Sequence, residues 1–278
     1  MTPATPDLRD FSGRLLLVGA GKMGSALLEG WLRFGLDPKR IAVMEPQPSP
    51  QIFTLTSQGL RLNPELRALA DVSAAVIAVK PQSAAEAIPP LKPMIGASTV
   101  VVSIMAGRTL QFIAGALNAP CALVRAMPNT PAAIGRGITV AVAAKKVSAA
   151  QRATADALLA AIGSVEWVED EKLMDAVTAV SGSGPAYVFL LAEELARAGV
   201  EAGLPEALAT KLARETVAGS GELLHRSDLA SATLRQNVTS PGGTTAAALE
   251  VLMGLEGLQA LMTRAVAAAT RRSKELAK

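Results

Sequence analysis

The first half of the chain alternates short apolar runs with segments in which apolar residues recur at helical spacing. The apolar runs predict six β-strands, at residues 15–18, 41–44, 75–79, 100–104, 122–126 and 138–143. Helices are predicted between several of these strands and after the last one, at residues 24–34, 82–88, 110–117 and 149–162. Because strands and helices alternate, the predicted fold class is α/β with a doubly wound parallel sheet. Residues 164–168 add a predicted edge strand.

From about residue 172 onward the spacing of apolar residues is helical throughout. Helices are predicted at residues 185–202, 205–224, 229–237, 244–253 and 255–276, with Gly-Leu-Pro at 203–205 and Ser-Pro-Gly-Gly at 240–243 as breaks. We therefore predict two domains, an α/β domain at 1–168 and an all-helical domain at 169–278. Several of these helices are apolar on more than one face, and such helices have to be buried. Because so short a domain has little interior of its own, we expect a second copy of the chain to bury it.

Composition narrows the class of protein. Half of the 278 residues are hydrophobic, only 3% are aromatic and the net charge is +3. Few aromatic rings argue against a protein that stacks nucleic-acid bases. Cys121 is the one cysteine, so the chain has no internal disulfide, and with a single histidine a zinc site is disfavoured. The first residues lack a secretory pattern and the uncharged stretch at 176–192 is broken by glycine and proline, so we expect a soluble, cytoplasmic protein.

A glycine motif follows the first predicted strand and opens the first predicted helix. It reads Gly19-Ala20-Gly21-Lys22-Met23-Gly24. In this context Gly19 permits the tight turn, Gly21 lets a pyrophosphate approach the backbone, and Gly24 lets the helix pack on the strand. The motif predicts a Rossmann-type dinucleotide-binding domain.

A second loop, at residues 238–245, reads Val-Thr-Ser-Pro-Gly-Gly-Thr-Thr and leads into a predicted helix. Adjacent glycines expose backbone N–H groups, and a helix N-terminus carries partial positive charge, so the loop is suited to a carboxylate. The alternative is an ordinary helix start after a Pro-Gly turn. The candidate anion-binding residues are Ser240, Gly242, Gly243, Thr244 and Thr245.

The chain resembles the pyrroline-5-carboxylate reductases over nearly its whole length. The glycine motif is shared with many dehydrogenases, whereas three other segments are specific in their order and spacing: 125–131 (Arg-Ala-Met-Pro-Asn-Thr-Pro), 181–187 (Ser-Gly-Ser-Gly-Pro-Ala-Tyr) and 238–245. The resemblance implies reduction of 1-pyrroline-5-carboxylate to L-proline by hydride transfer from NADPH or NADH. It also implies an all-α dimerisation domain after the Rossmann-type domain, homodimers as the minimum unit, and a decamer of five dimers as a further level of assembly.

The resemblance also assigns residues to the site. It implies cofactor contacts at Val79, Lys80, Pro81, Met105, Ala106 and Asn129, all at or just after the ends of predicted strands. Ligands of such sheets bind beyond the carboxyl ends of the strands, which places these loops around the nicotinamide. Lys80 is a cofactor contact in this interpretation, although related β-hydroxyacid dehydrogenases use a lysine as a base. Thr245 matches the threonine that the family places near the imine nitrogen, where it orients the substrate.

Glu45 ends the second predicted strand at the position where an acidic residue usually binds the adenosine ribose hydroxyls. A carboxylate there repels a 2′-phosphate, and no arginine follows in the next several residues. We therefore expect NADH to be used at least as well as NADPH, although the resembled family often prefers NADPH.

Two other functions are compatible with the glycine motif. One is a related imine, ketimine or β-hydroxyacid dehydrogenase, which leaves residues 238–245 unexplained. The other is a non-catalytic NAD(P)-binding sensor, which would bind the cofactor tightly without oxidising it. His225 ends a helical pattern, where a histidine commonly caps the helix, and we do not expect it to be the general acid. No metal and no nucleic-acid or membrane partner is expected.

Overall fold

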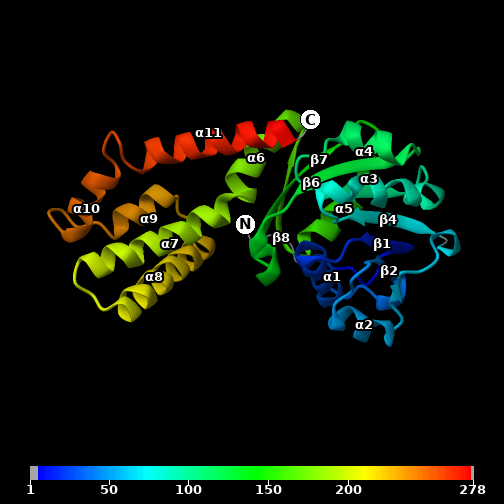
Figure 1. Ribbon diagram of the computed structural model, residues 1–278, viewed down its shortest axis with the longest axis horizontal. Helices are drawn as coiled ribbons and strands as arrows, with labels where there is room; N and C mark the ends of the chain where they lie inside the picture. The colour runs from blue at the N-terminus through cyan, green and yellow to red at the C-terminus, as the bar shows by residue number, and fades with distance from the viewer. Residues whose placement is uncertain (1–5, 70, 277–278) are drawn as a thin grey trace. The chain divides into compact units, whose positions relative to one another are not determined.

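The computed structural model describes residues 6–69 and 71–276, which form two compact units (Figure 1). The first, here called the sheet unit, runs to Gly182 and also includes the described end of the chain from Thr270. The second, the helical unit, comprises residues 183–269. These compact units do not test the functional boundary expected at 168/169, which stays a prediction.

The sheet unit contains one eight-stranded sheet with the strand order β3-β2-β1-β4-β5-β6-β7-β8. Its strands are β1 (Arg14–Val18), β2 (Ile41–Met44), β3 (Arg61–Leu62), β4 (Val72–Ile77), β5 (Val100–Ser103), β6 (Ala122–Met127), β7 (Gly137–Ala143) and β8 (Gly163–Val168). The neighbouring strands are parallel except β6 and β7, which are antiparallel. The predicted doubly wound α/β sheet is therefore confirmed, with β7 and β8 as a departure, because both run antiparallel to the other six strands. Only a short link joins β6 to β7, and a parallel connection would need a longer crossover.

Successive residues of the strands serve two cores, one on each face of the sheet. Leu15 and Leu17 of β1 belong to one core, and Leu16 and Val18 belong to the other. This alternation follows from the two-residue period of a strand. The first core receives α1 (Lys22–Arg33), α2 (Pro50–Thr56) and α5 (Ala149–Ala160), and the second receives α3 (Ala84–Ala87) and α4 (Leu110–Leu117). The fully buried Trp31 of α1 donates its indole N–H to the Leu158 carbonyl of α5, at 2.8 Å.

Short helical turns fill several connections of this unit. The 3₁₀ turns are η1 (Pro38–Arg40), η2 (Leu66–Ala68), η3 (Pro81–Ser83), η4 (Pro89–Met94), η5 (Thr130–Ile134) and η6 (Glu171–Leu173). After η6 come α6 (Met174–Val177) and a π-helical turn, Thr178–Gly182. The unit thus continues past β8 to the glycine-rich segment at 181–187.

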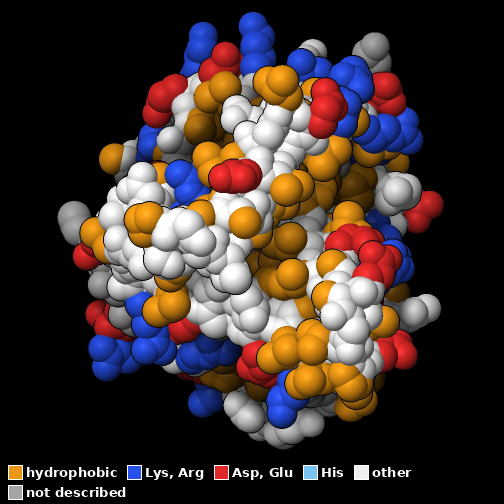
Figure 2. All heavy atoms as spheres, turned by 90° about the vertical axis from the view of Figure 1, so that its left-hand side faces the viewer, with side chains coloured by type: hydrophobic (Ala, Val, Ile, Leu, Met, Phe, Trp, Pro, Cys, Tyr) orange, Lys and Arg blue, Asp and Glu red, His pale blue; other side chains and the backbone are white. Residues whose placement is uncertain are grey.

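The helical unit is built from α7 (Gly184–Glu201), α8 (Glu206–Arg226), α9 (Ser231–Asn237), α10 (Thr244–Leu252) and most of α11 (Leu258–Leu276). Helices α7 and α8 pack side by side, with Gly199 facing Ala209. Across residues 183–269 only Ala209 and Ala213 are buried. The all-helical prediction is confirmed, and Figure 2, which looks onto this unit, shows many hydrophobic side chains at its surface. In the described part of the chain no helix is both long enough and apolar enough to cross a membrane.

Candidate active site

The glycine motif forms a tight turn between β1 and α1. Gly19 has a φ of +91°, and its N–H donates to the Met44 carbonyl of β2 at 2.8 Å. A Cβ on Gly24 would lie 2.2 Å from the Gly19 carbonyl oxygen, so α1 approaches the turn as closely as the backbone allows. A Cβ on Gly21 would meet no atom within 4 Å. The space above Gly21 is therefore open toward a ligand, as a pyrophosphate site requires.

The Glu45 carboxylate lies directly beside this turn. Its Oε2 accepts the Ala20 N–H at 2.7 Å, and its Oε1 accepts the Gln47 N–H at 3.0 Å. The Glu45 backbone is held by Asn63, whose side-chain oxygen accepts the Glu45 N–H at 2.8 Å and whose amide nitrogen donates to the Glu45 carbonyl at 2.9 Å. A carboxylate can accept about four hydrogen bonds. Glu45 therefore keeps acceptor capacity for the hydroxyls of a ribose.

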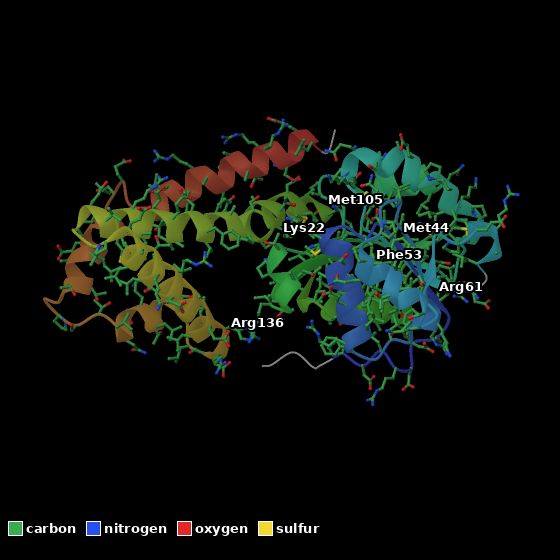
Figure 3. The ribbon with its side chains drawn as sticks, turned by 60° about the horizontal axis from the view of Figure 1, so that its bottom comes forward. Lys22, Met44, Phe53, Arg61, Met105 and Arg136 are labelled. Atoms are coloured by element: carbon green, nitrogen blue, oxygen red, sulfur yellow. The ribbon has the colours of Figure 1, made fainter. Side chains whose placement is uncertain are left out.

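A pocket of about 670 Å³ extends from the glycine turn between the ends of β1, β2 and β4. Of the residues expected at the cofactor it is lined by Gly19, Gly21, Glu45, Val79 and Lys80. Met44 at its edge is labelled in Figure 3. One side of the pocket is an apolar slot formed by Leu66, Ala87, Pro90 and Leu91. The slot and Glu45 together match the two parts of an adenosine, a flat apolar ring and a polar sugar.

Sequence reasoning missed the slot and Asn63. Leu66, Ala87, Pro90 and Leu91 come from η2, α3 and η4, short turns without a motif of their own. Asn63 was detectable in part, because Asn-Pro marks a turn and asparagine tolerates its observed φ of +44°.

The remaining predicted cofactor residues occupy different positions. Ala20 binds Glu45, whereas Lys22 and Met23 open α1, with Lys22 exposed. Met105 is only 2% exposed, because its side chain packs in the second core, so its expected contact with a cofactor is left to its backbone and stays a prediction. Ala106 is exposed. The Asn129 side-chain oxygen accepts the Ile138 N–H at 2.9 Å, which ties the loop after β6 to the start of β7.

A buried charge joins β6 to η6 and to the start of α4. The Arg125 side chain on β6 is 5% exposed and donates to Glu171 Oε1 at 3.0 Å. The same oxygen accepts the Leu110 N–H of α4 at 2.8 Å. Beyond Arg125, the side chain of Met127 lies against Gly182 of the π-helical turn, where a Cβ would be 2.6 Å from the methionine Cε. The glycine-rich segment at 181–187 therefore begins with a close approach to the end of β6.

The candidate carboxylate-binding loop lies in the helical unit. Gly242 has a φ of +67°, the Gly243 N–H donates to the Ser240 carbonyl at 3.0 Å, and α10 begins at Thr244. The residue before the helix, Gly243, supplies no side-chain cap. The first N–H groups of α10 are therefore available to an anion. Thr245 is half-buried and occupies the second position of the helix.

Three other expectations concern residues outside these loops. His225 lies in the last turn of α8, as predicted. Cys121 is half-buried against the second core, and burial raises the pKa of its thiol, which opposes reactivity. Among the residues that the structure describes, no group of three or more histidine, cysteine or acidic side chains is placed to hold a metal ion.

The fold and the pocket define a dinucleotide-dependent oxidoreductase of the Rossmann type. The residues fit a nicotinamide cofactor because the glycine turn leaves room at Gly21 and a carboxylate stands where a ribose binds.

Comparison with known proteins places the chain within this class. Residues 171–276 match the family profile described as "Pyrroline-5-carboxylate reductase dimerisation", and residues 14–107 match "NADP oxidoreductase coenzyme F420-dependent". A pyrroline-5-carboxylate reductase of Synechocystis is 42% identical, covering 95% of this chain and 98% of the relative. One from Pseudomonas aeruginosa is 37% identical, with 95% and 97% covered.

Solved structures agree. A pyrroline-5-carboxylate reductase from Coxiella burnetii has a TM-score of 0.88 and 34% identity, and 96% of this chain and 99% of that chain are covered. A Plasmodium falciparum pyrroline carboxylate reductase with NADP bound has a TM-score of 0.79 and 30% identity, with the same coverage. The chain belongs to the pyrroline-5-carboxylate reductase family and is an NAD(P)H-dependent oxidoreductase with a C-terminal dimerisation domain.

Proposed function

We propose that this protein reduces 1-pyrroline-5-carboxylate to L-proline with a hydride from NADH or NADPH, the last step of proline biosynthesis. The observation that carries the proposal is the similarity to named reductases across 95% of the chain. Two features support it physically: the dinucleotide pocket of the sheet unit and the exposed N–H groups at the start of α10.

In this proposal the cofactor and the residues around the substrate have separate roles in the reaction. The bound reduced nicotinamide supplies the hydride that adds to the imine carbon. Ser240 and the backbone of Gly242, Gly243 and Thr244 hold the substrate carboxylate, and the Thr245 hydroxyl bonds at the imine nitrogen. A protonated imine is already electrophilic and becomes a neutral amine on accepting a hydride, so the reaction requires neither a metal nor a covalent nucleophile. Lys80, which is exposed at the pocket, contacts the cofactor and is not the base.

The direct test is to mix the purified protein with pyrroline-5-carboxylate and NADH or NADPH. Loss of reduced-cofactor absorbance together with formation of proline is the expected result. Oxidation of the cofactor with other cyclic imines or with β-hydroxyacids alone would instead identify a different dehydrogenase. Tight cofactor binding without any turnover would identify a sensor.

We infer that the enzyme uses NADH at least as well as NADPH. Among the residues that line the pocket, Lys80 is the one cation, whereas Glu45 and Glu86 are both acidic. The Glu45 carboxylate is fixed by the Ala20 N–H of the glycine turn and by the Gln47 N–H, so it cannot swing away from a 2′-phosphate without breaking these bonds. A strong preference of the wild-type enzyme for NADPH would refute this inference.

Replacing Glu45 by glutamine tests the inference. Removing the negative charge should lower the ratio of kcat/KM for NADH to kcat/KM for NADPH by about tenfold, or ~1.4 kcal/mol. Glu86→Gln is the matched control, because it removes a charge from the same pocket at an exposed position away from the glycine turn. We expect the control to change the ratio by much less than Glu45→Gln does.

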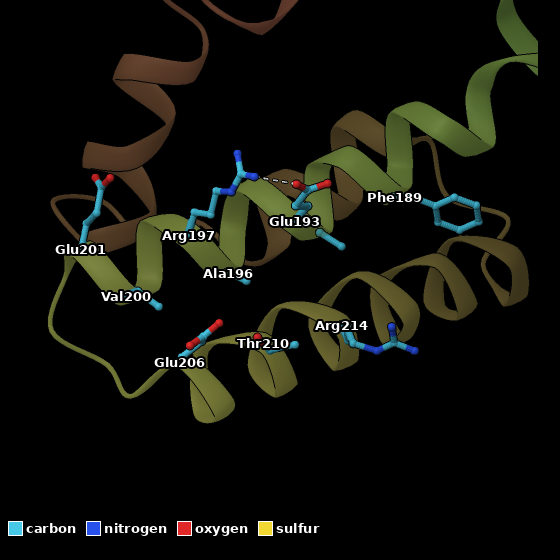
Figure 4. A pocket seen from close by; sticks show the side chains of 10 residues that line it. Phe189, Glu193, Ala196, Arg197, Val200, Glu201, Glu206, Thr210 and Arg214 are labelled. Carbon is cyan, nitrogen blue, oxygen red and sulfur yellow. Dashed lines mark hydrogen bonds and ion pairs between the residues drawn. The ribbon is translucent and has the colours of Figure 1, made fainter.

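We further propose that the functional unit is a homodimer joined through the helical unit. Phe189, Leu190 and Leu191 are consecutive on α7 and are 68%, 53% and 52% exposed. Consecutive helical residues point about 100° apart, so no single neighbouring helix covers all three. A groove of about 610 Å³ lies between α7 and α8 and is lined at one end by Phe189 (Figure 4). Helices of the second copy would pack into this groove. A decamer of five dimers and a cytoplasmic location stay predictions.

Gel filtration and sedimentation at micromolar concentration should give a dimer, and Phe189→Arg should weaken it. Losing the burial of one phenylalanine costs about 1.5–3 kcal/mol, and a homodimer loses two, which corresponds to a dimer Kd raised roughly a hundredfold to ten-thousandfold. Phe53→Arg is the matched control, because Phe53 is also exposed but lies on α2 of the sheet unit (Figure 3). A stable wild-type monomer would contradict the proposal.

A further inference from the structure

Arg108 joins two loops that the proposed function places at the nicotinamide. Its guanidinium donates twice to the carbonyl oxygen of Pro81, from Nε at 3.3 Å and from Nη2 at 3.1 Å. Pro81 follows Val79 and Lys80 in the loop after β4, and Arg108 follows Met105 to Gly107 in the loop after β5. One side chain thus spans the two loops.

The guanidinium is itself held in place. It lies over the ring of Phe112, with Cζ 4.5 Å from the ring centroid. Phe112 is in the first turn of α4, where its N–H donates to Thr109 Oγ1 at 3.1 Å. Earlier in the same turn, the Leu110 N–H donates to Glu171 Oε1. Because that oxygen also accepts from Arg125 of β6, the start of α4 is fixed to the sheet as well. The planar cation therefore has a rigid support.

The hydrogen bonds from Arg108 act on the backbone of the loop, because their acceptor is the Pro81 carbonyl oxygen. The Pro81 carbonyl also accepts the Ala84 N–H, which closes the η3 turn. On the other loop, Gly107 has a φ of +72°, a conformation that suits glycine, immediately before Arg108. The turn at Gly107 and the two hydrogen bonds from Arg108 to the Pro81 carbonyl, here called the clamp, together set the distance between the two loops.

We propose that Arg108 is a positioning residue, which fixes the spacing between residues 79–81 and 105–107 and so the placement of the nicotinamide ring. This inference rests on the proposed function for the assignment of those loops. Arg108 bonds to Pro81, whereas the glycine turn and Glu45 bond to each other without it. Loss of the clamp should therefore misplace the reacting ring while leaving the rest of the cofactor bound.

The test compares Arg108→Met with Arg152→Met. Methionine keeps an apolar stem over the aromatic ring and removes the donors. Arg152 is a matched control because it also lies over an aromatic ring, with Cζ 4.3 Å from the centroid of Trp167. Its ion-pair partner is Glu169, which is not in a cofactor loop. We expect Arg108→Met to lower kcat by about tenfold, as a slightly misplaced reactant does, with ADP-ribose affinity unchanged. Arg108→Lys should recover part of the loss, and Arg152→Met should leave kcat at the wild-type value.

A second readout does not depend on turnover. The fluorescence of bound NADH reports the surroundings of the nicotinamide ring, and it should change in Arg108→Met but not in Arg152→Met. Wild-type kcat and wild-type NADH fluorescence in Arg108→Met would overturn the inference. So would a parallel fall in ADP-ribose affinity and thermal stability, since this marks a general structural role. Failure of wild-type protein to reduce pyrroline-5-carboxylate would refute the proposed function instead, and the fluorescence comparison would still decide the role of Arg108.

Discussion

Replacing Thr245 by alanine should lower kcat/KM for pyrroline-5-carboxylate by roughly tenfold to a thousandfold, the range for losing a positioned hydrogen bond in a reaction. A threonine hydroxyl can both donate and accept a hydrogen bond, so it can orient the imine nitrogen and relay a proton to it from water. It is too weak an acid to be the proton source alone. The expected loss is therefore partial.

The structure makes this substitution an informative one. Thr245 lies in the first turn of α10, and within the described residues its hydroxyl has no hydrogen-bond partner. Alanine is also the better helix former. We therefore expect Thr245→Ala to leave thermal stability unchanged, so that a loss of activity reports on the hydroxyl alone.

Two further variants separate the hydroxyl from the shape of the side chain. Thr245→Val keeps the branched shape and should behave like alanine, whereas Thr245→Ser keeps the hydroxyl and should stay near the wild-type rate. Steady-state kinetics with both substrates varied gives the required constants. An unchanged rate in Thr245→Ala would remove Thr245 from the mechanism.

The second large effect concerns the glycine turn, where two substitutions of the same chemistry should have opposite consequences. Gly24→Ala places a Cβ 2.2 Å from the Gly19 carbonyl oxygen, and only movement of the backbone relieves this clash. Overpacking of this kind typically costs about 1–3 kcal/mol and occasionally more, and we expect about 3 kcal/mol here, because the clash is with backbone. Thermal unfolding of the full-length protein without cofactor should show this loss of stability.

Gly21→Ala should leave the free protein intact and abolish tight cofactor binding. Gly21 has a φ of −66° and a ψ of −167°, an extended conformation that alanine adopts without strain, and its Cβ would meet no protein atom within 4 Å. The new methyl would instead occupy the space of the pyrophosphate. We expect the Kd for NADH to rise by roughly a hundredfold, or ~2.7 kcal/mol. Wild-type affinity in this variant would show that the pyrophosphate does not approach the backbone at Gly21.

The elements of the chain could be predicted closely wherever the apolar pattern was strong. The predicted ranges of β2 and α4 coincide with the observed Ile41–Met44 and Leu110–Leu117. The fourth strand of the sheet lies at Val72–Ile77, earlier than the predicted 75–79. The apolar run continues past the strand, and pairing of Val72 with Arg14 of β1 sets where the strand begins. Local pattern cannot supply such a register.

Short elements escaped prediction because little of their sequence is buried. Helix α2 buries only Ile52, and β3 is two residues long with none buried. The π-helical turn at Thr178–Gly182 has no sequence period of its own, since it arises from a shift in backbone hydrogen bonding.

In the candidate site, too, features with local causes could be predicted, and features that depend on residues distant in the sequence could not. Gly19, Gly21, Gly24 and Glu45 were recognisable because close backbone approach and a charge after a strand are properties of a few neighbouring residues. Met105 was expected at the cofactor, but its side chain lies in the core, because which face of the sheet it joins depends on its neighbours in space. Substrate residues 240–245 formed the predicted turn and helix start, and their role stays a prediction.

The residues alone were thus sufficient for the α/β sheet, the glycine turn, the acidic residue beside it and the helices with apolar residues on more than one face. These follow from side-chain period, glycine geometry and unburied apolar faces, all of which act over short stretches of chain. The apolar slot of Leu66, Ala87, Pro90 and Leu91, the support of Glu45 by Asn63 and the clamp from Arg108 to Pro81 emerged from folding. Each joins segments distant along the chain, and the sheet order that brings them together depends on the packing of the whole unit.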